Sequence, residues 1–283
     1  DRLRSRGLGD VYKRQLLCSQ LCSSASAAMA SEEPYNSGIV IRWKDCKQRI
    51  DGFGIAQAGW AKELFAFKNR EQVMDKMFGK DGLRLNILRG EIFPHYWENE
   101  TDKDFNLNDD IHIELSDSDF INKSDDLLRR GQLWLTLKAK NKYHISKLVF
   151  STWSAPAWMK SNGKVSNGRL KTECYTDFAN YLAAFYNAYK SKGIAPYAIS
   201  PSNEPGYAAP WNSSLWTADE MGKFITSYLG PTFRKENIPA KIIFGENPLW
   251  AVYMPQLKMV SSKDFTDTCL LYTSPSPRDR SLS

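Results

Sequence analysis

Apolar residues recur along the chain either at every second position or at helical spacing, and segments with these two patterns alternate. Runs that alternate every second residue predict strands, and runs with helical spacing predict helices. The predicted strands cover residues 39–43, 48–56, 83–89, 147–154, 197–199 and a run that starts at Lys241. The predicted helices cover residues 69–78, a part of 119–142 broken near Gly131, residues 175–189, and a stretch that opens with a capping box at Thr217 and ends at Gly230-Pro231. Because strands and helices alternate, the sequence predicts a parallel sheet with right-handed crossovers.

The number of strand–helix units indicates which kind of parallel sheet this is. About five units begin at Ile50, whereas a closed (β/α)8 barrel needs eight. An open nucleotide-binding sheet is the weaker alternative, because Gly52-Phe53-Gly54 lacks the third glycine and the helix start of a dinucleotide fingerprint. The pattern therefore predicts an α/β fold, a (β/α)8 TIM barrel truncated after about the fifth strand.

The two ends of the chain differ from the segment between them. Residues 1–15 are basic and residues 269–283 are rich in Ser, Pro and Arg without periodicity, and we interpret both as adapter-derived sequence. Residues 16–30 are short, apolar and small, and end in Ala28-Met29-Ala30, which favours the remnant of a signal peptide and a secreted protein. The alternative is that Met29 is an initiator and the codons before it are untranslated. Three glycosylation sequons agree weakly with secretion, at Asn99, Asn122 and Asn212.

Composition narrows the possible partners. The 283 residues are 42% hydrophobic and 25% charged, as in an ordinary globular protein, and they include 9 Trp, 13 Tyr and 14 Phe. Flat aromatic faces suit sugar rings, although large cores also use them. The net charge of +6 is spread without a long basic run, so nucleic acid is not indicated, and no apolar run is long enough to span a membrane. The cysteines and histidines lack metal-binding spacing, and no cofactor is expected.

The most informative polar residues follow the strand predicted at residues 197–199. Pro201 and Pro205 cannot donate ladder hydrogen bonds, so the strand ends there and presents Asn203 and Glu204 at its C-terminal end. In (β/α) barrels this end of the strands carries the active site. A carboxyl held there and partly shielded could have the raised pKa that a general acid requires. The alternative is a polar turn that merely ends the strand.

Four motifs occur in order on successive predicted strand ends. They are QRIDGF at residues 48–53, Leu88-Arg89, the run WSAPAWMKSNG that starts at Trp153, and ISPSNEP at residues 199–205. Together they resemble glycoside hydrolase family 30, retaining glycosidases that include glucosylceramidase, β-1,6-glucanases, β-1,6-galactanases and glucuronoxylanases. The resemblance implies a (β/α)8 barrel with a small β side domain. Residues 31–47 would supply a strand of the side domain, and residues 48–268 the partial barrel.

The resemblance also implies roles for individual residues. Glu204 looks like the general acid/base, and Asn203 resembles the residue that hydrogen-bonds the sugar 2-hydroxyl. Arg89 matches an arginine that keeps the nucleophilic carboxylate ionised, and Trp153 matches an aromatic wall beside the reacting sugar. Trp60 is expected to line the opposite side. The alternatives are a buried ion pair for Arg89 and a core position for each tryptophan.

The chain departs from the family pattern in one large respect. Retaining hydrolysis needs two carboxyls about 5–5.5 Å apart, and the family nucleophile ends a seventh strand that this chain lacks. Glu246 also ends a strand, but one strand after the acid/base, so we assign it to binding or local structure. Glu91 and Glu98 are interpreted as carboxylates of a long polar loop at residues 91–118. We therefore expect an inactive piece of an enzyme on β-linked carbohydrate, with a non-catalytic carbohydrate-binding barrel as the alternative.

Overall fold

The computed structural model describes residues 50–57, 60–97, 100–101, 127–248 and 271–272. The chain divides into two units, residues 1–51 and residues 52–283, and almost all described residues belong to the second. The adapter-derived and leader segments predicted at residues 1–30 lie outside the described residues. So do the side-domain strand predicted at residues 31–47 and the carboxylate of Glu98.

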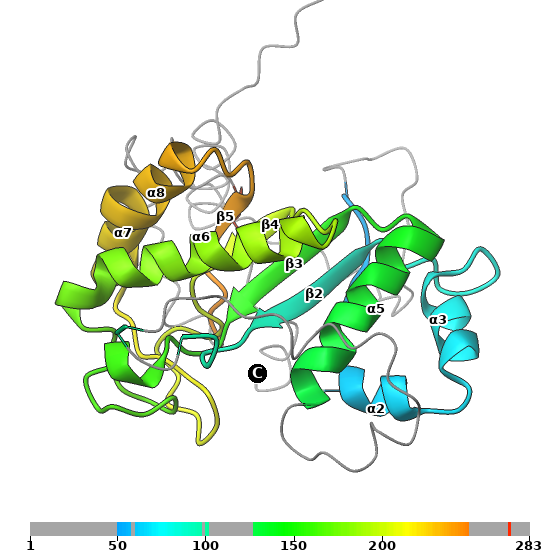
Figure 1. Cartoon of the computed structure of the whole chain (residues 1–283), viewed down its shortest axis with the longest axis horizontal. Helices are drawn as coiled ribbons and strands as arrows, with labels where there is room; N and C mark the ends of the chain where they lie inside the picture. The colour runs from blue at the N-terminus through cyan, green and yellow to red at the C-terminus, as the bar shows by residue number, and fades with distance from the viewer. Residues whose placement is uncertain (1–49, 58–59, 98–99, 102–126, 249–270, 273–283) are drawn as a thin grey trace, which may run out of the picture. The chain divides into compact units, whose positions relative to one another are not determined.

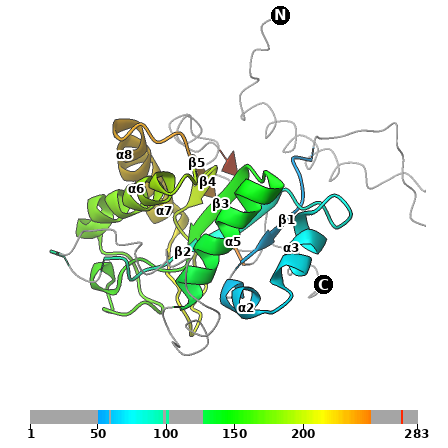
Figure 2. The ribbon, with the colours of Figure 1, turned by 45° about the vertical axis from the view of Figure 1, so that its right-hand side comes forward.

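Six parallel strands form one sheet in which spatial order follows chain order (Figure 1). The strands are β1 (Gly54–Ala56), β2 (Ile87–Ile92), β3 (Lys147–Thr152), β4 (Ala198–Ser200), β5 (Lys241–Phe244) and β6 (Leu271–Tyr272). Each strand pairs in parallel with the next along the chain. Figure 2 shows β1 toward one end of the sheet and β5 toward the other. This is the winding of a TIM barrel, so the predicted fold class is confirmed.

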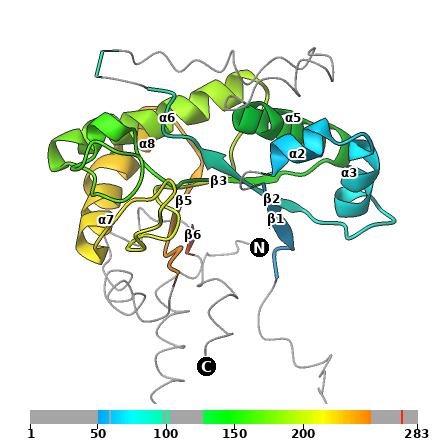
Figure 3. The same cartoon turned by 90° about the horizontal axis from the view of Figure 1, so that it is seen from below.

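Helices connect the strands and cover one face of the sheet. They are α2 (Ala61–Ala66), α3 (Arg70–Phe78), α5 (Leu127–Tyr143), α6 (Tyr175–Ser191), α7 (Ala218–Phe224), a π-helical turn (Ile225–Leu229) and α8 (Gly230–Lys235). Two 3-10 turns, Ala157–Met159 and Thr172–Cys174, lie between β3 and α6. Figure 3 shows α2, α5 and α6 together on the same side of the strands.

The core is richest where α6 packs on β3. Aromatic and aliphatic residues recur at helical spacing along α6, and its buried members include Phe178, Tyr181, Leu182, Phe185, Tyr186 and Tyr189. The ring of Phe150 on β3 lies 5.1 Å from that of Phe185 and 5.0 Å from that of Tyr189. The helix predicted at residues 175–189 is therefore confirmed, and Gly193 ends it with a φ of +80° that suits glycine.

Strand β2 continues past the point where the sequence predicted its end. We expected it to stop at Arg89-Gly90, but it runs on to Ile92. The backbone of Glu91 is held by the amide of Gln132 on α5, which accepts from the Glu91 N–H and donates to its C=O, each at 2.7 Å. Glu91 is consequently a buried strand residue, and its assignment to a polar loop was wrong.

Two predicted helix breaks were also wrong. Helix α5 passes through Gly131, which is buried, without interruption. The last helix opens with the predicted capping box of Thr217 and Glu220 but does not end at Gly230-Pro231. A π-helical turn precedes the proline, with the Gly230 N–H bonded to the C=O of Ile225. Since proline has no N–H to satisfy, it fits at the start of the next helical segment.

The sixth strand lies in a segment that we had excluded as adapter-derived. Leu271 and Tyr272 pair with Ile243 and Phe244 of β5. An open strand edge presents unpaired N–H and C=O groups that an extended segment can bond. The sheet therefore has six strands, where the sequence led us to count about five.

Substitution of Gly90 by alanine tests the close approach of β2 and β3. An added Cβ would lie 2.7 Å from Cε1 of Phe150 and 2.9 Å from Oε1 of Gln132. Because overpacking forces neighbours to move, we expect Gly90→Ala to lower the free energy of unfolding by about 1–3 kcal/mol, measured by urea denaturation. The control is Gly163→Ala, where the added carbon meets no atom within 4 Å and only the left-handed backbone opposes it. An equal or smaller loss in Gly90→Ala than in this control would contradict the packing argument.

Candidate active site

The guanidinium of Arg89 joins the ends of four successive strands. Its Nη2 donates to Oδ1 of Asn203, after β4, at 2.7 Å. Its Nε donates to Oε1 of Glu246, after β5, at 3.2 Å, and Nη2 lies 3.1 Å from the same oxygen. Its Cζ lies 4.6 Å from the ring centroid of Trp153, which follows β3. Three of the predicted site residues, Arg89, Asn203 and Trp153, are thus brought together at the C-terminal ends of the strands.

The exit from β4 is fixed by the end of β3. The N–H of Asn203 donates to the C=O of Thr152 at 2.6 Å, and Oγ1 of Thr152 donates to the C=O of Pro201 at 2.5 Å. Glu204 follows with a φ of +45°, a left-handed conformation that is unfavourable for a residue with a Cβ. Its C=O accepts from the N–H of Tyr207 at 3.1 Å. The half-exposed carboxyl of Glu204 is therefore carried on a strained but anchored turn.

Glu246 is more deeply engaged than the sequence indicated. Its Oε1 binds Arg89, and its Oε2 accepts from Oγ of Ser151 at 2.8 Å. The side chain is only 14% exposed. Because protein donors bind both carboxylate oxygens, Glu246 orients the guanidinium of Arg89.

Trp60 lies apart from this group of contacts. It precedes α2, and its indole N–H donates to the C=O of Ala56 at the end of β1, at 2.5 Å. Across the described ranges, no hydrogen bond or ring contact joins Trp60 to Arg89 or Asn203. Its expected place on the opposite side of the sugar stays a prediction.

Glu91, like Glu246, is a carboxyl near Arg89. Residues two apart on a strand point to the same face, so Glu91 lies on the same face of β2 as Arg89. This two-residue spacing was the sequence signal that would have placed Glu91 beside the site. Glu91 is 9% exposed, and burial raises the pKa of its carboxyl to about 7. A hydrogen bond from the side chain of Asn212 and the positive charge of Arg89 act in the opposite direction on this pKa.

Lys160, at the end of the WSAPAWMK run, is fully buried. Its Nζ donates to Oγ of Ser154 at 3.0 Å, to the C=O of Ser213 at 2.5 Å and to Oγ of Ser214 at 3.1 Å. Burial lowers the pKa of the Lys160 ammonium to about 8. The sequence motif includes Lys160 but indicated no separate role for it.

Two large aromatic side chains stand exposed on the loop that follows Glu204. Tyr207 is 44% exposed and Trp211 is 55% exposed, with ring centroids 6.4 Å apart. The loop beneath them is anchored by the contacts of Asn212, Ser213 and Ser214. Such exposed rings on a fixed loop are suited to contact a flat apolar face of a ligand.

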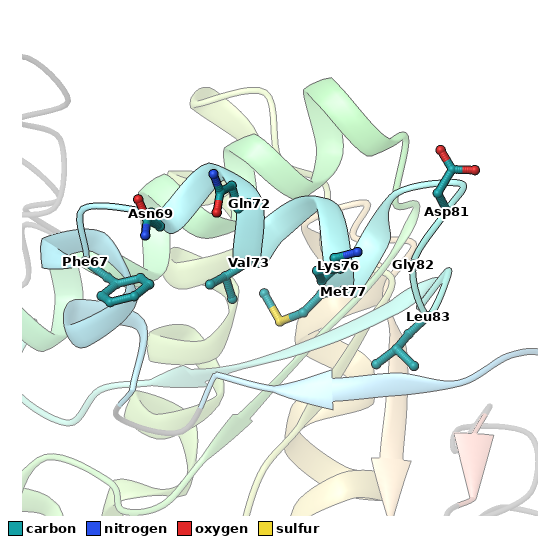
Figure 4. A pocket seen from close by; sticks show the side chains of 9 residues that line it. All are labelled: Phe67, Asn69, Gln72, Val73, Lys76, Met77, Asp81, Gly82 and Leu83. Carbon is teal, nitrogen blue, oxygen red and sulfur yellow. The ribbon is translucent and has the colours of Figure 1, made fainter.

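A hollow of about 690 Å³ lies elsewhere, along α3 and the turn after it. Figure 4 shows Phe67, Val73 and Met77 along one side of α3, with Leu83 near its far end. None of the predicted site residues lines it. In the described segments, no cluster of three or more His, Cys, Asp or Glu could hold a metal ion, and no helix there is long and apolar enough to cross a membrane.

The winding of the sheet and the polar group at its C-terminal edge define a TIM-barrel domain of the glycosidase class. Residues 50–246 match the Glycosyl hydrolase family 30 TIM-barrel domain. The chain belongs to this family, as the sequence motifs had suggested.

The chain is similar to enzymes with different substrates within the family. It is 29% identical over 224 residues to Putative glucosylceramidase 3 of Caenorhabditis elegans, covering 74% of this chain and 41% of that protein. It is 28% identical over 213 residues to the endo-1,6-beta-D-glucanase of Neurospora crassa, covering 69% of this chain and 42% of that protein. The fold is similar to the catalytic domain of GH30 xylanase C from Talaromyces cellulolyticus, with a TM-score of 0.65 and 22% identity over 82% of this chain and 54% of that one. The chain thus spans about half the length of the proteins it matches, or less.

The raised pKa of Glu91 predicts a pH-dependent stability. Between the ordinary value of 4.5 and about 7, the folded protein binds more protons than the unfolded chain. Stability should therefore fall as pH rises through this range, by about 3 kcal/mol in the free energy of unfolding. We expect Glu91→Gln to remove this part of the pH dependence when urea denaturation is compared at pH 5 and pH 8. The exposed control Glu173→Gln should keep it, and parallel curves for wild type and Glu91→Gln would contradict the assignment.

Proposed function

We propose that the chain is part of a retaining β-glycosidase that cleaves a β-linked polysaccharide or glycoside through a covalent glycosyl-enzyme. The observation that carries the proposal is the contact of Arg89 with Asn203 and Trp153, directly beside Glu204. An acid, an amide and an aromatic face near the C-terminal ends of barrel strands are the groups that retaining glycoside hydrolysis uses, and this supports the proposal. The family membership and its glycosidase relatives support the same class of reaction.

In this proposal Glu204 is the general acid/base. Its carboxyl protonates the glycosidic oxygen as the bond breaks, and its carboxylate then takes a proton from the water that releases the sugar. Asn203 binds the sugar 2-hydroxyl. Because Oδ1 of Asn203 accepts from Arg89, its Nδ2 is the atom that faces the hydroxyl, and this hydrogen bond strengthens as positive charge develops on the sugar.

The nucleophile in this proposal is a carboxylate of a later strand. Arg89 would keep that carboxylate ionised through charge-assisted hydrogen bonds. Glu246 is a weaker candidate, since Arg89 and Ser151 bind both of its oxygens. We therefore infer that the 283-residue chain alone is inactive. We also infer secretion, which rests on the small apolar segment at residues 16–30.

The substrate-binding surface in this proposal is aromatic. Trp153 lies against Arg89 beside the reacting sugar, and Tyr207 and Trp211 extend the aromatic surface along the loop after Glu204. The same surface would serve the second candidate, a non-catalytic carbohydrate-binding barrel. The exposure of Tyr207 and Trp211 favours sugar binding in either case.

Hydrolysis assays separate the two candidates. We expect no hydrolysis of aryl β-glycosides, β-1,6-glucan or glucuronoxylan by the 283-residue chain, and hydrolysis of at least one of them by a longer form that carries the later strands. In that form, Glu204→Gln should lower kcat/KM by about 10²- to 10⁴-fold on these substrates, and by less on a dinitrophenyl glycoside, whose leaving group needs no proton. The kcat on the dinitrophenyl glycoside should still fall, because the water that releases the sugar loses its general base. The exposed control Glu236→Gln should retain full activity.

The opposite results are equally informative. Hydrolysis by the 283-residue chain would contradict the absence of the nucleophile. A longer form that binds β-linked oligosaccharides without hydrolysing any of them would favour the carbohydrate-binding barrel.

Sugar binding by the 283-residue chain tests the exposed aromatic pair independently of catalysis. We expect Trp211→Ala to raise the Kd for a β-linked oligosaccharide about two- to tenfold, because an aromatic contact contributes about 0.5–1.5 kcal/mol. Isothermal titration calorimetry would measure it. The control is Phe67→Ala, which removes an exposed ring near α3 and should leave the Kd unchanged. Equal affinities of wild type and Trp211→Ala would exclude Trp211 from the binding surface.

A further inference from the structure

One buried ammonium holds two consecutive residues of the loop that follows Glu204. Lys160, after β3, donates to the C=O of Ser213 and to Oγ of Ser214. These acceptors lie 53 and 54 residues further along the chain, so the contact joins two separate loops.

Lys160 uses its full hydrogen-bonding capacity in this contact. An ammonium has three N–H donors, and those of Lys160 reach Ser154 in its own loop and Ser213 and Ser214 in the facing loop. Within the described part of the chain, no carboxylate forms an ion pair with it. Removal of the ammonium would leave the C=O of Ser213 and the hydroxyls of Ser154 and Ser214 without this donor. The ammonium therefore holds the two loops together.

Backbone hydrogen bonds show that the segment is fixed against the loop after β3. The N–H of Ser213 donates to the C=O of Val165 at 3.0 Å, and the N–H of Leu215 donates to the C=O of Gly168 at 2.9 Å. At the other end of the loop, the N–H of Asn203 is bonded to Thr152. The stretch from Glu204 to Trp211 thus lies between two segments, Asn203 and Ser213, whose backbones are hydrogen-bonded to other parts of the structure.

We propose that Lys160 is a positioning residue that clamps residues 213–214 and so holds Glu204 and the exposed aromatic pair in place for the reaction. The inference rests on the proposed role of Glu204 as acid/base. Glu204 keeps a left-handed backbone only while its surroundings fix it, and release of residues 213–214 frees one end of its loop. The clamp acts through the loop, since Lys160 does not contact Glu204 in the described segments.

Amide hydrogen exchange of the 283-residue chain tests the clamp without any need for activity. Lys160→Met should speed exchange of the Ser213 and Leu215 amides at least tenfold and speed that of Asn203. The amides of α6 should stay within twofold of wild type. The matched control Lys164→Met makes the same change at an exposed lysine of the same loop and should alter nothing. Unchanged loop amides, or equal acceleration in α6, would overturn the clamp.

Kinetics of a longer, active form test the positioning role itself. Lys160→Met should lower kcat at least tenfold, because Glu204 acts on bond breaking. KM should rise by no more than the about two- to tenfold expected for the Kd of Trp211→Ala, because the loosened loop also carries the aromatic pair. An unchanged kcat in a variant whose loop exchanges faster would overturn the positioning role. If the unsubstituted longer form hydrolyses no glycoside, the proposed function fails and the positioning role fails with it, whereas the exchange data still decide whether the clamp exists.

Discussion

The site depends on one planar cation that binds groups from three other strand ends. Arg89 reaches Asn203 and Glu246, which are 114 and 157 residues away in the chain, and its face lies on Trp153. Parallel strands make this possible because their C-terminal ends meet at one edge of the sheet. A lysine has no planar fork and could not bind both acceptors while stacking on the ring. Arg89 belongs to one of the family motifs, and it contacts both the residue before the proposed acid/base and the aromatic wall.

Around Arg89 the protein buries charge at a cost to its stability. Glu91 and Lys160 are both buried, and burial moves their pKa values in opposite directions, up for the carboxyl and down for the ammonium. Neither is an ion-pair partner of the other among the described contacts. The aromatic packing of α6 on β3 supplies the stability that permits such groups at the strand ends.

The sequence predicted best those features that depend on local pattern. Strand–helix alternation predicted the barrel, and Pro201 and Pro205 predicted where Asn203 and Glu204 would be presented. The misassigned features depend on distant partners. A glycine often marks the end of a strand, so the sequence predicted that β2 ends at Gly90 and assigned Glu91 to a loop. In the structure, the missing side chain of Gly90 instead makes room for the ring of Phe150 from β3, and the strand continues.

The same reason explains why other features were missed or misassigned. The role of Lys160 could not be predicted, because its acceptors in the facing loop lie 53 and 54 residues further along the chain. Gly131 and Pro231 look like helix ends by intrinsic preference, yet α5 runs through the first and a π-helical turn precedes the second.

A guanidinium carries five N–H donors, and the contacts of Arg89 with Asn203 and Glu246 use those on Nε and Nη2. In the described segments the Nη1 donors remain for one further acceptor, so Arg89 could bind the carboxylate of a later strand without releasing Glu246.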